Sequence, residues 1–242
     1  MQTLFQSLSI VRSLLFGLLL LGGSGCDLSQ AVPSDWVLSK TSQERLRERT
    51  AEMVGGEEAA AFRGQFEVAK AEVLTALETL FGTAQAPHWP MGRSGDEAPT
   101  LLVEAAAVYQ AECTHCHGAE GFGNGPSSPF LEPAPWNFSI GVFPRTAPQG
   151  GLPKPKDIKD LLAYGIDEAS MPPFERLGEE TLIALSGHVL LLTRRAQVEW
   201  ALVDAWIKAG PNSLQGDKPL EIYQAWESEM ANASKNNTPV QD

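Results

Sequence analysis

The chain has 242 residues, of which 43% are hydrophobic and 20% are charged, and this composition is typical of a globular protein. Its length suits one large domain, or a medium-sized domain with sizeable extensions. The formal net charge of −12 argues against binding to nucleic acid or to an anionic lipid surface, and it favours protein partners that present a basic patch.

The first 25 residues have the features of an export signal. Their only charged residue is Arg12, an apolar stretch runs from Leu14 to Leu21, and small residues occupy positions 22–25. This stretch is shorter than the about 20 apolar residues that a membrane-spanning helix needs. We therefore expect residues 1–25 to be a signal peptide and the folded part of the protein to lie outside the cytoplasm.

Cys26 comes directly after these small residues. The arrangement resembles a bacterial lipoprotein signal, in which this cysteine is lipidated and becomes the first residue of the mature protein. Such signals usually carry Leu, Val or Ile three residues before the cysteine, where this chain has Gly23. The resemblance implies lipidation of Cys26 and a lipid anchor at the periplasmic face of a bacterial membrane. An ordinary cleaved signal and an uncleaved anchor are the alternatives.

Residues 26–98 are expected to form a tether, two helices and a linker. The first helix should begin near Thr41 and end before the two glycines at 55 and 56. The second should cover residues 57–81, where apolar residues recur at helical spacing. Residues 83–99 are rich in proline and glycine, which indicates a linker.

The rest of the chain is predicted to be a helical domain at 99–195 and a helical extension at 196–242. Helices are expected over residues 100–112, 156–165, 178–194, 196–209 and 220–231, and the polar last ten residues are expected to be disordered. Residues 118–155 lack periodicity and are rich in glycine and proline, so we expect an irregular loop there. The predicted fold class is all-α.

The motif Cys-Thr-His-Cys-His at 113–117 is the strongest chemical signal in the sequence. Two thiols on one helical turn can form thioethers with the two vinyl groups of one porphyrin, and the histidine that follows then binds the iron axially. A zinc site would need further Cys or His ligands, and a thioredoxin-type pair would follow a strand. The only other cysteine is Cys26. The motif therefore predicts one covalent haem c, attached through Cys113 and Cys116, with His117 as an iron ligand.

Met171 is the candidate for the second axial ligand. It is followed by Pro172 and Pro173, which hold the chain extended, so that the thioether can point at the iron. The alternative is a loop methionine that fills a gap in the core. The other four methionines lie in the signal, before the cysteine motif, or on a helical face in the C-terminal extension.

Taken together, residues 100–194 resemble a class I c-type cytochrome. The order matches that family: a helix with Tyr109, the haem motif, a glycine-rich loop, a short helix, Met-Pro, and a C-terminal helix. In the family a proline carbonyl accepts a hydrogen bond from the haem histidine, and the resemblance gives this role to Pro126. The loop at 133–155 departs from the family, and its Trp136, Asn137 and Arg145 could hold haem propionates or fold back on the haem edge.

The resemblance implies an electron carrier that is not itself an enzyme, because two axial protein ligands leave no open iron position for O₂ or peroxide. We expect a membrane-tethered mono-haem protein, which relays single electrons between a membrane oxidoreductase and another carrier or terminal oxidase, as a candidate subunit of a respiratory complex. One alternative is a haem subunit of a small-molecule dehydrogenase or a peroxidase-like enzyme. Another is a docking subunit, whose helices outside the haem domain contact a partner.

Overall fold

The computed structural model describes residues 35–54, 59–90, 100–143 and 153–235. Its α-helices are α1 (Lys40–Val54), α2 (Ala59–Phe81), α3 (Thr100–Glu112), α4 (Thr114–His117), α5 (Pro155–Tyr164), α6 (Glu179–Ala209) and α7 (Lys218–Lys235). Short 3-10 helices are η1 (Ser128–Phe130), η2 (Phe138–Ile140), η3 (Asp167–Ala169) and η4 (Glu175–Leu177). The part of the chain described contains helices and no strand, which confirms the predicted all-α class.

The signal peptide at 1–25, Cys26 and Arg145 lie outside the described residues. The two helices expected before residue 98 are present as α1 and α2, with ends within two residues of the predicted ones. Within the described ranges, no helix combines the length and the hydrophobicity that crossing a bilayer requires.

The C-terminal region differs from the prediction in one important way. Two helices were expected, one ending at Arg194 and one beginning at Ala196, but α6 runs without interruption through both. No proline lies within it, and its buried face continues across the expected break through Arg195, Ala196 and Val198. The helix ends at Gly210, which has a φ of 82° and is followed by a proline.

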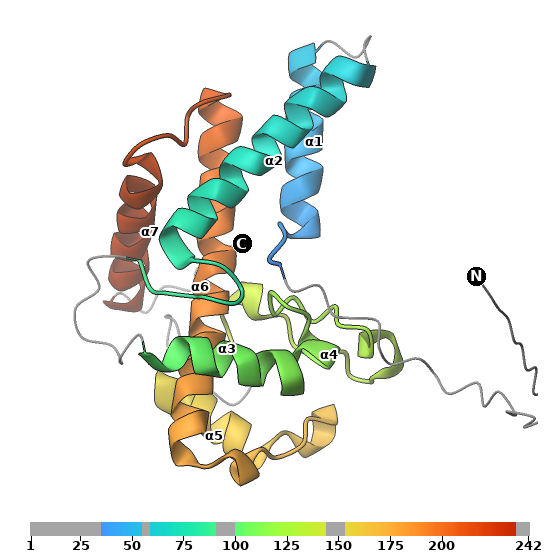
Figure 1. Ribbon diagram of the computed structural model, residues 1–242, viewed down its shortest axis with the longest axis vertical. Helices are drawn as coiled ribbons and strands as arrows, with labels where there is room; N and C mark the ends of the chain where they lie inside the picture. Colours follow the sequence, from blue (N-terminus) through green and yellow to red (C-terminus); the bar gives the residue numbers. More distant parts are fainter. Residues whose placement is uncertain (1–34, 55–58, 91–99, 144–152, 236–242) are drawn as a thin grey trace, which may run out of the picture. The chain divides into compact units, whose positions relative to one another are not determined.

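Helix α6 connects two hydrophobic clusters. The first cluster, core A, is formed mainly by α1, α2, α7 and the second half of α6, and includes Leu46, Val73, Leu77, Phe81, Leu202, Val203, Trp206 and Tyr223. The second, core B, surrounds the first half of α6 and includes Tyr109, Cys113, Phe138, Phe143, Ile158, Leu162, Leu185 and Val189. Figure 1 shows α3 and α5 beside one half of α6, and α1, α2 and α7 beside the other.

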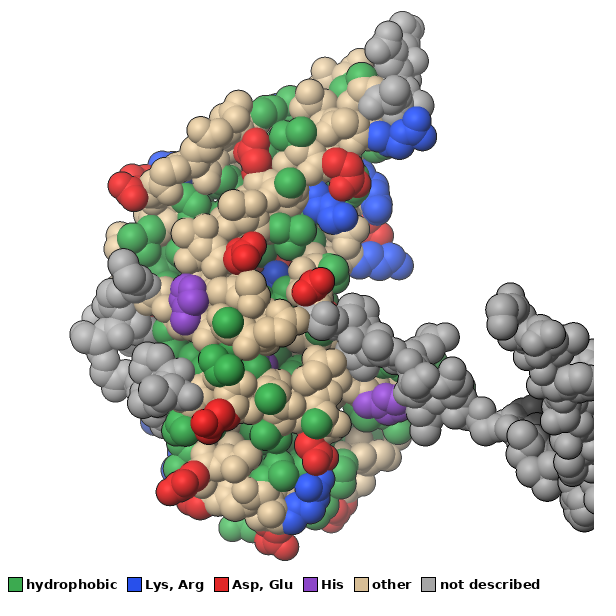
Figure 2. Space-filling view, in the orientation of Figure 1, with side chains coloured by type: hydrophobic (Ala, Val, Ile, Leu, Met, Phe, Trp, Pro, Cys, Tyr) green, Lys and Arg blue, Asp and Glu red, His purple; other side chains and the backbone are tan. Residues whose placement is uncertain are grey.

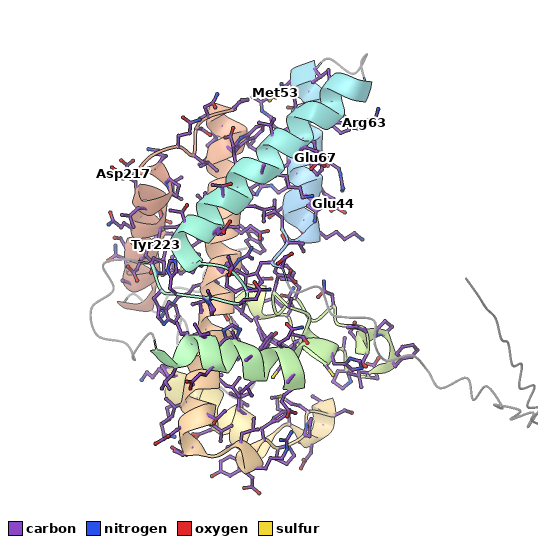
Figure 3. The ribbon with its side chains drawn as sticks, in the orientation of Figure 1. Glu44, Met53, Arg63, Glu67, Asp217 and Tyr223 are labelled. Atoms are coloured by element: carbon purple, nitrogen blue, oxygen red, sulfur yellow. The ribbon has the colours of Figure 1, made fainter. Side chains whose placement is uncertain are left out.

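The helices α1, α2 and α7 bury their apolar side chains against one another and against the second half of α6. Tyr223 projects from α7 toward α2 (Figure 3), and its ring centroid lies 6.0 Å from that of Phe81. Trp206 is 0% exposed and Trp226 is 8% exposed, so both belong to core A, whereas Trp200 is 36% exposed. Two of the three tryptophans of the C-terminal extension therefore stabilise the fold of this chain itself.

Two tryptophans from the N-terminal half join the clusters where α6 passes from one to the other. Trp36 and Trp89 each pack against both core A and core B. The guanidinium carbon of Arg195 lies 4.8 Å from the ring centroid of Trp36, and that of Arg194 lies 4.9 Å from that of Trp89. Such cation–π contacts add specific geometry to the apolar packing. Trp36 and Trp89 thus link the two clusters at Arg194 and Arg195, two neighbouring residues of α6.

His188 is a buried histidine at the crossing of α3 and α6. It is 2% exposed, its ring centroid lies 5.0 Å from that of Tyr109, and its Nδ1 atom has no hydrogen-bond partner among the described residues. Burial lowers its pKa to about 4, because the charged imidazolium loses its hydration inside core B.

The buried His188 predicts a pH-dependent loss of stability. In the unfolded chain this histidine takes up a proton near its ordinary pKa of about 6.5, and in the folded chain only near pH 4. The free energy of unfolding should therefore be lowest below pH 4 and should gain on the order of 3 kcal/mol from this group as pH rises to about 6.5. Denaturant titrations across this range should show that gain in the wild type. The His188→Phe variant should lack it, and superimposable pH profiles would contradict this prediction.

Candidate functional site

The two cysteines of the motif lie on one helical turn that follows α3. Cys113 begins the turn, and its carbonyl oxygen accepts hydrogen bonds from the amides of Cys116, at 3.2 Å, and His117, at 2.9 Å. Thr114 is anchored to α3, since its hydroxyl donates to the carbonyl of Gln110 at 2.8 Å. The turn therefore holds both thiols and the imidazole of His117 on a short, rigid segment.

Neither cysteine takes part in a disulfide bond. Burial raises the pKa of the Cys113 thiol to about 12, and burial also raises the pKa of the Cys116 thiol. Both thiols are therefore protonated at neutral pH. A thiol–disulfide oxidoreductase needs the opposite, a thiolate with a lowered pKa. The electrostatics of this pair thus argue against a thioredoxin-type function.

His117 is held by the loop that follows it. Its Nδ1 atom donates a hydrogen bond to the carbonyl oxygen of Trp136 at 3.1 Å, and its ring centroid lies 4.8 Å from that of Phe138. Burial lowers the pKa of His117, and the hydrogen bond to Trp136 partly opposes this shift. The imidazole is therefore neutral, with its proton on Nδ1, so the lone pair of Nε2 is available to a metal.

This hydrogen bond corrects the expectation for Pro126. The predicted acceptor was the carbonyl of Pro126, but the structure gives Nδ1 of His117 the carbonyl of Trp136 instead. The reason is the course of the loop: Gly125 lies against α4, where a Cβ atom would overlap the carbonyl oxygens of Thr114 and His115. Pro126 directly follows this contact with the backbone of α4, and the chain returns to the imidazole ring only ten residues later.

The segment from Trp136 to Phe143 is fixed by its own contacts. The indole Nε1 of Trp136 donates to the carbonyl of Val142 at 2.7 Å, and the side chain of Asn137 accepts from the amide of Ser139 at 2.9 Å. The rings of Phe138 and Phe143 lie 5.4 Å apart within core B. The loop therefore folds back on His117. Sequence reasoning missed the carbonyl of Trp136, since every residue carries such a group.

Met171 is presented by a tight loop after α5. The residue pairs with Ile166 through two backbone hydrogen bonds, from the amide of Ile166 at 2.9 Å and from the amide of Met171 at 3.3 Å. Gly165 makes this closure feasible, because its φ is 69° and a Cβ there would overlap the carbonyl of Met171. The Met171 side chain is partly buried and packs against core B, the cluster that also contains Cys113.

These groups suit a haem better than a bare metal ion. They comprise two free thiols, a neutral imidazole with an open Nε2, and a thioether, and they adjoin one apolar cluster. Among the residues that the structure describes, no group of three or more His, Cys, Asp or Glu side chains could hold a metal ion. Thiols for thioether bonds, an imidazole and a thioether in apolar surroundings are the groups that a c-type haem uses.

Comparison with known proteins agrees with this chemistry. The family model described as cytochrome c oxidase, cbb3-type, subunit III matches residues 101–189. The match covers α3, the cysteine turn, Met171 and the first part of α6. No curated protein and no solved structure matches the chain significantly. The match therefore supports a c-type cytochrome domain at residues 101–189, in agreement with the haem chemistry of the site.

Proposed function

We propose that the protein is a mono-haem electron carrier with one covalent haem c. In this proposal Cys113 and Cys116 would form the thioether bonds, and His117 and Met171 would bind the iron. The observation that carries it is the hydrogen bond from Nδ1 of His117 to the Trp136 carbonyl, which leaves the lone pair of the imidazole on Nε2 for a metal. Such a histidine can bind iron without first losing a proton.

The chemistry that a bound haem supplies is the gain and loss of one electron at the iron. The chain's own residues then set the conditions for it. Core B packs apolar side chains around the site and so keeps water away from it. Fewer water molecules then have to reorient when the electron moves, so the reorganisation energy of electron transfer is lower. Met171 would supply a thioether to the iron, and such a ligand stabilises the reduced form. With both His117 and Met171 bound to it, the iron would have no place for a substrate, which separates a carrier from a peroxidase-like enzyme.

Partners are proposed from charge. Residues 101–189 carry eleven Asp and Glu against five Lys and Arg. On the face shown in Figure 2, acidic side chains are spread over this domain, whereas Lys and Arg gather beside α1 and α2. Opposite charge steers the encounter of redox proteins more than it tightens their complex. We therefore propose redox partners that present a basic docking patch.

The setting of the protein is proposed from its N-terminal sequence. The features of residues 1–25 support export, and Cys26 is placed for lipidation at the periplasmic face of a bacterial membrane. The matching family model is named for subunit III of a cbb3-type cytochrome c oxidase. We accordingly propose that the tethered cytochrome passes electrons between a membrane oxidoreductase and another carrier or terminal oxidase, as a subunit of a respiratory complex.

Replacement of Met171 tests the axial ligation. Met171→Ala should lower the reduction potential, abolish the weak long-wavelength absorption band that methionine ligation gives to ferric haem, and let the ferrous protein bind carbon monoxide completely. Met53→Ala, on the exposed side of α1, is the matched control and should change none of these properties. Carbon monoxide binding by the untreated wild type would instead favour the dehydrogenase or peroxidase-like alternative.

The lipid anchor is tested on the intact protein. Mass spectrometry of the protein extracted from membranes should find residues 1–25 removed and two or three acyl chains attached at Cys26. Cys26→Ser should lose this modification, and Ser29→Ala, three residues further on, should keep it. An N-terminus at another residue with an unmodified Cys26 would refute lipidation as the tether.

A further inference from the structure

A cluster of three ionisable side chains is buried beside the haem-binding loop. Glu120 lies three residues after His117 and is 5% exposed. Its Oε1 atom accepts a hydrogen bond from the amide of Val37 at 2.8 Å. The Glu120 carboxylate thus connects the loop that follows His117 to residues 36–39, the segment that precedes α1.

The other two members come from α6. Arg195 is 2% exposed and Glu199 is 0% exposed, and the Arg195 Nη1 atom lies 3.7 Å from the Glu199 Oε2 atom. The Glu199 Oε1 atom accepts from the amide of Ser39 at 2.8 Å. Neither Arg195 Nε nor Glu199 Oε2 has a hydrogen-bond partner among the described residues. The segment at 36–39 is therefore bound by both carboxylates, and its Trp36 covers the guanidinium.

The charges of this cluster do not balance. It contains two carboxylates and one guanidinium, and the facing segment at 36–39 contributes an indole and backbone amides but no charge. A further titratable neighbour is the phenol of Tyr109 on α3, whose pKa is raised first by burial, then by Cys113 and Glu120. A buried net negative charge is costly, and taking up one proton removes it.

Burial favours the neutral form of both Glu120 and Arg195. Burial raises the pKa of Glu120, and Glu199 raises it further, while the amides of Val37 and Glu120 and the charge of Arg195 oppose the shift. Burial lowers the pKa of Arg195, although both carboxylates oppose this. The most readily protonated position is therefore a carboxylate close to the haem loop.

We propose that Glu120, Arg195 and Glu199 form a redox-linked proton site, which takes up one proton when the haem is reduced and releases it when the haem is oxidised. The proposal rests on haem binding at His117. Reduction adds one electron from the redox partner, so the centre loses one positive charge, and one proton from solvent restores the local balance. The Cα atoms of His117 and Glu120 are at most about 11 Å apart along the chain. Across about 10 to 15 Å at an effective dielectric of about 20, unit charges still interact by more than thermal energy.

The test is the reduction potential of the holoprotein as a function of pH, from about pH 4 to about pH 9, a range that spans a raised carboxyl pKa. In the wild type the potential should fall as pH rises between the pKa of the cluster in the oxidised protein and its higher pKa in the reduced protein. Glu120→Gln keeps an oxygen for the amide of Val37 and should lose most of this slope. Glu132→Gln, an exposed glutamate on the same loop, is the matched control and should keep it.

Two further measurements make the outcome decisive. Haem propionates also titrate, but they remain in every variant, so only the slope lost by substitution is assigned to the cluster. If Glu120→Gln does not fold, Glu199→Gln and the direct uptake of protons by the wild type on photoreduction replace it. A reversible wave whose slope survives both substitutions, or reduction without proton uptake, would overturn the proton site alone. A chain without a reversible haem wave would overturn the proposed function as well.

Discussion

The imidazole of His117 is held between the ring of Phe138 and the carbonyl oxygen of Trp136, and the chemistry of the site depends on this contact. The hydrogen bond places the proton on Nδ1, so Nε2 is free for a metal, and it fixes the ring against rotation. The acceptor is itself restrained, because the indole of Trp136 is bound to Val142. A loop without regular secondary structure thus provides a rigid orientation for the group that matters most.

The second constraint is the continuity of α6. One helix crosses core B, which contains Cys113, and core A, which contains α1, α2 and α7. The helices outside the cytochrome domain are therefore not merely appended to it. Arg195 and Glu199 on α6 also contact residues 36–39, the segment that precedes α1. A change of charge near His117 can therefore shift the protonation of the buried groups Arg195 and Glu199, which the proposed proton site requires.

Sequence reasoning succeeded where the determinants are local. The spacing of Cys113, Cys116 and His117 defines a single turn, and the bounds of α1 and α2 follow from glycines and apolar periodicity. Sequence reasoning failed where the determinants lie far apart in the chain, or where they are backbone groups that every residue carries. A break was expected near residue 195, but Arg195 is buried there, and its guanidinium lies over the ring of Trp36 from a segment far away in the chain. The carbonyl of Trp136 and the electrostatic interaction of Glu120 with Arg195 and Glu199 leave no pattern in the sequence.

Covalent attachment of one haem is the central claim, and the mass of the denatured protein tests it most directly. The chain should be produced with its export signal in a host that matures c-type cytochromes, then unfolded in acid and weighed intact. We predict that the chain keeps the mass of one haem, and that it is lost when Cys113 and Cys116 are both replaced by alanine. A wild-type chain that releases its haem on unfolding, or that carries none, would contradict the claim.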